Sequence, residues 1–156
     1  MSANDATTAA NKAVSNFNAA LSSLVAAIAS KNRTDPDVLR LKDQMAIALR
    51  EAPSLVVEKV GPHIFKYGDA IQNRRIDMLL NTDYSNEVRT AYEDAGVTLD
   101  TDHLEYGMTM IQICKKTWHQ FVPAEQNVIW KHLITLLSQY AAYLMACKKT
   151  STATIK

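Results

Sequence analysis

The fold is decided by one stretch between Lys12 and Lys31, which reads AVSNFNAALSSLVAAIAS over residues 13–30 and carries no charge. Apolar side chains in and just before it recur at alternating intervals of four and three residues: Ala10, Val14, Phe17, Leu21, Leu24 and Ile28. That spacing places them in one stripe along an α-helix. The stretch therefore predicts a long amphipathic helix from about Ala6 to Ser30.

The side of this helix opposite the stripe consists of serine, asparagine and alanine. A helical face that meets only water usually carries glutamate and lysine. Small uncharged side chains let another backbone come close, so we expect this helix to be covered by a neighbour. The expected partner contacts are Phe17, Leu21, Ser22, Ser23, Leu24 and Ile28.

Turn and cap signals divide the rest of the chain into further helices. Thr34 or Asp35 should cap a helix that begins at Pro36, and Pro53 should open a short helix that ends at Gly61-Pro62. The helices expected after these span about 69–81, a short segment ending at 96, 102–120 with a capping box at its start, and 123–149.

No run of residues alternates with period two, so the predicted fold is all-α. We expect one helical domain over residues 1–156, an irregular multi-helix bundle with long first and last helices and short helices between them. Residues 1–5 should form a loose N-terminal arm and residues 150–156 a polar C-terminal tail.

Composition limits the classes of function. A formal net charge of +1, with basic pairs such as Arg74-Arg75 scattered among acids, argues against nucleic acid or an anionic membrane as partner.

Cys114 and Cys147 form no disulfide framework. The N-terminus lacks the basic start and apolar segment of a signal peptide. The uncharged tract 132–147 is shorter than a bilayer span. We therefore expect a reducing, intracellular setting and no membrane span.

No catalytic, metal or nucleotide signature is present in the sequence. The histidines at 63, 103, 119 and 132 lack zinc-ligand spacing and are expected to be satisfied or surface residues. The acidic run 100–105 fails the requirements of an EF-hand loop, and four isolated glycines cannot build a phosphate loop. Cys114 lies among apolar residues, where a thiol is usually part of the core. We predict no enzyme, no cofactor and no metal site.

The last helix is apolar on more than one face over residues 128–137, VIWKHLITLL. A helix of this kind lies at the centre of a bundle or is shared with a partner. We expect Trp130 to anchor the core there.

Two segments are similar to a known group of proteins. The first contains Pro53, the run Val60-Gly61-Pro62 and Tyr67, and the second is WKHLITLLSQY, residues 130–140. A proline-started helix, a "VGP…Y" turn and a closing Trp-x-x-Leu-x-x-Leu helix recur in small all-helical proteins of large nucleocytoplasmic DNA viruses of algae and protists. The chain resembles these over about residues 53–149. The resemblance implies a minor capsid or virion-assembly role, and it carries over no functional residue.

These patterns favour a non-enzymatic structural or interaction protein that acts through charge-poor helix surfaces in the virion or host cytoplasm. Its expected partners are capsid proteins or a second copy of itself. The alternative is a small helical adaptor or regulator that binds a host or viral protein transiently. A large, stable interface would favour the first function, and micromolar, reversible binding the second.

Overall fold

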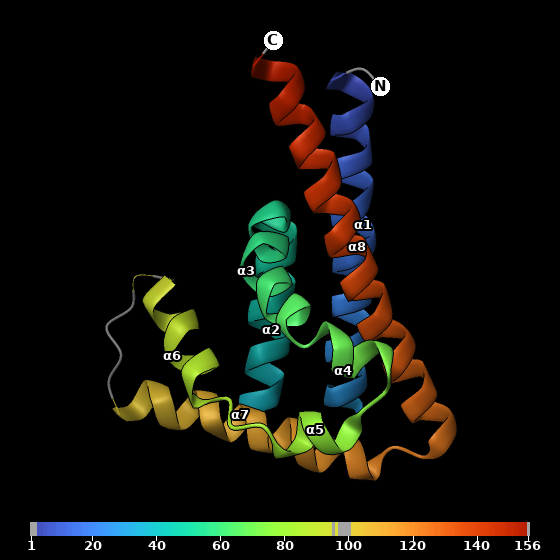
Figure 1. Cartoon of the computed structure of the whole chain (residues 1–156). Coiled ribbons are helices and arrows are strands. Elements are labelled where there is room, and N and C mark those ends of the chain that lie inside the picture. Colours follow the sequence, from blue (N-terminus) through green and yellow to red (C-terminus); the bar gives the residue numbers. More distant parts are fainter. Residues whose placement is uncertain (1–2, 95, 97–100, 156) are drawn as a thin grey trace.

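The computed structural model describes residues 3–94, 96 and 101–155, and over these residues the chain forms eight α-helices. The two longest, α1 (Ala3–Ser30) and α8 (Pro123–Ile155), lie side by side and antiparallel, so that both ends of the chain are at the same end of the molecule (Figure 1). The prediction of an all-helical protein with long first and last helices and short helices between them is confirmed.

The outer ends of α1 and α8 differ from the prediction. Residues 3–5 are helical, so the loose arm expected there is wrong over these residues, and α8 continues to Ile155, past its expected end near Lys149. Residues 1, 2 and 156 lie outside the described part of the chain. The physical reason at the C-terminal end is that no glycine or proline follows Pro123, so no residue stops the helix.

The seam between α1 and α8 is the most extensive contact between helices. Ala13, Phe17 and Ala20 of α1 are buried in one cluster with Leu136, Tyr140 and Tyr143 of α8. Both sets follow alternating intervals of three and four residues, which is the pattern of helices packed at a shallow angle.

Helix α2 (Pro36–Glu51) begins as the sequence predicts. Asp35 is the cap, and its carboxylate accepts hydrogen bonds from the backbone N–H groups of Asp37 at 2.9 Å and Val38 at 3.3 Å. Pro36 occupies the first turn, where a missing N–H costs nothing. Of the two predicted caps, Asp35 is therefore the one used.

Helix α3 (Pro53–Lys66) continues through Gly61-Pro62, so the predicted helix end there is wrong. Gly61 is buried, and a Cβ atom on it would lie 2.2 Å from Cδ1 of Tyr140. This glycine serves the close approach of α3 to α8 and does not end the helix. Pro62 lies inside the helix, where it removes one backbone hydrogen bond, and it is exposed.

The single helix predicted near residues 69–81 is two helices, α4 (Gly68–Gln72) and α5 (Ile76–Asn81). Arg74, between them, has a positive φ of 51°. Its guanidinium donates a hydrogen bond to Oδ1 of Asn127 at 2.8 Å, and the N–H of Arg75 donates to the carbonyl of Ala70 at 2.8 Å. These contacts hold the chain in a turn that helical periodicity does not reveal.

Helix α7 (Thr101–Gln120) crosses below the lower end of α1 and leads into the first turns of α8, and α6 (Ser85–Asp94) packs against it (Figure 1). Thr117 of α7 is completely buried. Its hydroxyl donates to the carbonyl of Ile113 at 2.6 Å and accepts from Nδ2 of Asn32 at 3.0 Å. This satisfied polar pair fixes α7 beneath the end of α1. The side chain of Asp102, predicted to cap α7, lies outside the described side chains.

Candidate functional site

The six predicted contact residues of α1 lie on two sides of the helix. Phe17 and Leu21 are buried in the chain's own core, Leu24 and Ile28 are half-buried, and Ser22 and Ser23 are exposed. The expectation that Phe17 and Leu21 contact a partner is thereby corrected. The reason is that α8 supplies an apolar stripe of the same period, and the two stripes cover each other.

Over residues 13–30, which follow the exposed Lys12, the surface of α1 that is left uncovered carries no charged side chain. Ser15, Ala19, Ser22, Ser23 and Ala26 are all exposed, and we call these five residues the outer face of α1. The exposed side of α2 differs, because it carries charged residues at positions 40, 42, 43, 50 and 51. The outer face of α1 is therefore the first candidate site, a surface for contact with another protein.

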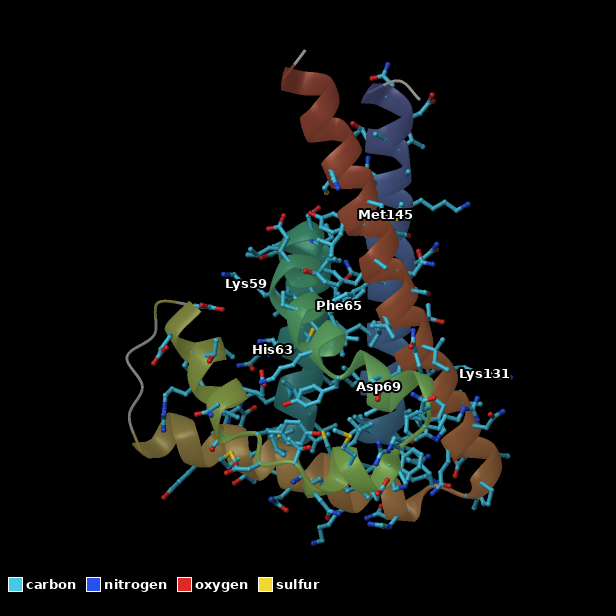
Figure 2. All side chains as sticks on the ribbon, in the orientation of Figure 1. Lys59, His63, Phe65, Asp69, Lys131 and Met145 are labelled. Atoms are coloured by element: carbon cyan, nitrogen blue, oxygen red, sulfur yellow. The ribbon has the colours of Figure 1, made fainter. Side chains whose placement is uncertain are left out.

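A second candidate site is centred on Glu87 of α6. Lys66 Nζ donates to Glu87 Oε1 at 2.5 Å, the Tyr67 hydroxyl donates to the same oxygen at 3.1 Å, and His63 Nδ1 is hydrogen-bonded to Oε2. We call these four residues the Glu87 cluster. In Figure 2, His63 is labelled on the side of α3 that is nearest α6.

Electrostatics favour the ionised carboxylate in this cluster. Burial opposes the charge on Glu87, but the hydrogen bonds from Lys66, His63 and Tyr67 outweigh burial and lower the pKa of Glu87. The pKa of Tyr67 is raised, first by its own burial and then by its hydrogen bond to Glu87. At neutral pH the carboxylate is therefore charged and the phenol keeps its proton.

A carboxylate hydrogen-bonded to an imidazole is an arrangement that can orient a general base. In the Glu87 cluster the same carboxylate also accepts hydrogen bonds from Lys66 and Tyr67. All three donors come from the C-terminal end of α3, whereas Glu87 is on α6. The cluster therefore ties α6 to α3.

An apolar cavity of about 330 Å³ lies beside the Glu87 cluster. Its aliphatic lining comes from Ile64 of α3, Ile71 of α4, Leu79 of α5, Ile111 of α7 and Leu133 of α8. Tyr84 and three members of the Glu87 cluster, His63, Tyr67 and Glu87, complete the lining. The rings of Tyr67 and Tyr84 meet edge to face, with their centroids 5.5 Å apart.

Sequence reasoning did not identify this site. His63 is half-buried and paired, in agreement with the expectation of a satisfied histidine. The spacing of His63, Lys66 and Tyr67 over three and four residues places them on one side of α3, and that signal could have been used. Glu87 and the cavity lining come from distant segments, so no local pattern announces them.

The remaining expectations concern the other histidines and the cysteines. His119 is exposed and His132 is half-buried, whereas the side chain of His103 is outside the described part. Cys114 is exposed, so its expected place in the core is wrong. Among the residues that the structure describes, no group of three or more His, Cys, Asp or Glu side chains could hold a metal ion.

Asn4–Ser30 in α1 is, within the described residues, the one helix long and apolar enough to cross a membrane by length and composition alone. In the structure its apolar stripe is buried against α8, and the core helix of a globular domain has the same composition. The absence of a membrane span stays a prediction.

Replacing Glu87 by glutamine should lower the free energy of unfolding at pH 7 by about 1–2 kcal/mol, because charge-assisted hydrogen bonds are lost. The pKa of Glu87 is lowered in the folded state. Its stabilising contribution is therefore complete above the ordinary glutamate pKa of about 4.3 and is lost as pH falls through the folded-state value. Urea unfolding from pH 7 to pH 3 should show a steeper loss for the wild type than for Glu87→Gln.

Glu93→Gln is the matched control, because Glu93 is an exposed glutamate on the same helix. This variant should keep the pH dependence of the wild type. If Glu87→Gln and Glu93→Gln titrate alike, the Glu87 cluster does not stabilise the docking of α6.

No protein-family model matches the chain, and comparison with curated proteins and with solved structures finds no match either.

Proposed function

We propose that this protein is a non-enzymatic structural or interaction protein that binds another protein through the outer face of α1. The observation that carries the proposal is the exposed, uncharged surface formed by Ser15, Ala19, Ser22, Ser23 and Ala26. It lies on a helix whose other side is already fixed by α8. A partner would therefore meet a rigid surface.

The chemistry of these side chains suits contact with a helix or another flat surface. Alanine and serine are short, so two helix axes can approach to about 8 Å. They also lose little side-chain entropy when they are immobilised. No charged side chain within residues 13–30 has to be desolvated.

The proposed biological role is that of a minor capsid or virion-assembly protein, with a capsid protein or a second copy of the chain as partner. This part of the proposal rests on the resemblance of residues 53–149 to proteins of large DNA viruses. The adaptor alternative uses the same face and differs in the lifetime of the complex.

The direct test is to introduce two negative charges with Ser22→Glu and Ser23→Glu. Because both side chains are exposed, helicity by circular dichroism should not change. Self-association measured by light scattering, or binding to a capsid protein, should weaken at least about tenfold, because a buried unpaired charge costs more than about 1.4 kcal/mol.

Thr109→Glu with Gln112→Glu is the matched control, since it makes the same change of charge at exposed polar positions of α7. That pair should leave association within about threefold of the wild type. Equal weakening by both pairs, or none by either, would show that the outer face of α1 is not the interface. Reversible micromolar binding that only the α1 pair abolishes would favour the adaptor alternative.

A further inference from the structure

We infer that the cavity beside the Glu87 cluster is a binding site for an uncharged, mainly apolar small molecule of two or three aromatic rings, or an alkyl chain of similar volume. The site is separate from the outer face of α1 and does not depend on the proposed function. Six helices or their flanking residues contribute to it, α3 to α8.

The site is formed where side chains of several helices converge. Ile64 and Ile71 line it from α3 and α4, Leu133 lines it from α8, and Ile111 lines it from α7 below them. None of these four side chains is among the strongly exposed hydrophobic residues of the molecule. An apolar ligand in the cavity would therefore contact side chains on several sides, as in typical small-molecule sites.

The polar groups around the cavity are already occupied by one another. The Tyr84 hydroxyl donates to the carbonyl of Leu79 at 2.5 Å, and the Tyr67 hydroxyl donates to Glu87. Lys66 and His63 also bind Glu87, so its negative charge is matched locally. The wall that remains is almost entirely apolar. A charged ligand would lose its hydration without gaining a partner, which restricts the class to uncharged molecules.

The volume sets the size of the ligand. The cavity measures about 330 Å³, whereas an apolar cavity of about 150 Å³ is enough to bind benzene. The space therefore matches two or three linked rings. The edge-to-face pair of Tyr67 and Tyr84 supplies aromatic surface against which such rings can pack.

The probe for the test is N-phenyl-1-naphthylamine, an uncharged compound whose fluorescence rises in apolar surroundings. Titration of the full-length protein should show saturable binding at one site per chain. Ile111→Trp should raise the Kd at least about tenfold, because the indole occupies the volume that the probe needs. Gln112→Trp is the matched control, since Gln112 is the exposed neighbour of Ile111 on α7 and lines a different surface groove. It should leave the Kd within about threefold of the wild type.

A second measurement needs no substitution in the cavity. With methyl-labelled protein, nuclear Overhauser effects from the aromatic protons of the probe should reach the methyl groups of Ile64, Ile71, Leu79, Ile111 and Leu133. Effects confined to the exposed Leu39, Ile47 and Leu55 would instead show binding to surface side chains and would overturn the inference. Non-saturable binding, or an equal loss in the two tryptophan variants, would also overturn it.

Discussion

Replacing Phe17 by alanine should lower the free energy of unfolding by about 3–5 kcal/mol. Phe17 has no exposed surface and belongs to the buried cluster that includes Val57 of α3 and Leu136 of α8. Neither of these two helices can move into the space left by the ring without losing its own contacts with α1. The loss of stability therefore combines the lost hydrophobic transfer free energy of the ring with the cost of the cavity that it leaves. Urea unfolding followed by circular dichroism gives the value.

Phe65→Ala is the matched control for this prediction. It removes the same ring from α3, but Phe65 is 55% exposed, and its ring meets that of Tyr140 edge to face with the centroids 6.1 Å apart. We expect a loss of about 1 kcal/mol or less. Similar losses in the two variants would mean that Phe17 is not in the centre of the core.

The sequence predicts best the helices whose signals are local. The stripe of α1 is complete within the helix itself, and α2 begins at Pro36 behind the cap Asp35, which is adjacent in sequence. The start of α8 at Pro123 is also local. These elements need no knowledge of the rest of the fold, because capping and periodicity act within one or two helical turns.

The errors arise where a distant residue decides the local structure. Gly61 in the sequence predicts a helix end because glycine favours such positions, but the ring of Tyr140 lies where its Cβ would be. The turn at Arg74 is held in part by Asn127. In both places a contact with α8 or its first turns overrides the local preference, and a single sequence does not contain that contact in readable form.

The candidate sites follow the same division between local signals and distant contacts. A periodic stripe shows that α1 must be covered, but not by what, and the structure assigns that role to α8. Only the opposite face, with Ser22 and Ser23, is left for a partner. The Glu87 cluster and the cavity combine six elements, so they become visible only when α6 is seen next to α3.

Replacing Trp130 by alanine at the joint between α7 and α8 should also lower the free energy of unfolding by about 3–5 kcal/mol. Trp130 is 5% exposed, which confirms its predicted place in the core. Its ring meets Trp118 of α7 edge to face, with the centroids 5.5 Å apart and the planes at 72°. Loss of the indole would remove the buried apolar contacts of α8 at this position and the ring contact that holds α7 against α8. Chemical unfolding measures the loss.

Trp118→Ala is the control that separates burial from ring contact. Trp118 is half-buried and takes part in the same ring pair, so its loss should cost less than that of Trp130. In Trp130→Ala, Trp118 is the one tryptophan left, and its emission should shift to longer wavelength if the joint opens. A loss below about 1 kcal/mol for Trp130→Ala, with unchanged Trp118 emission, would contradict the core role. It would place Trp130 at a surface, and the joint would then depend on neighbours such as Phe121 and Ile129, which are also buried there.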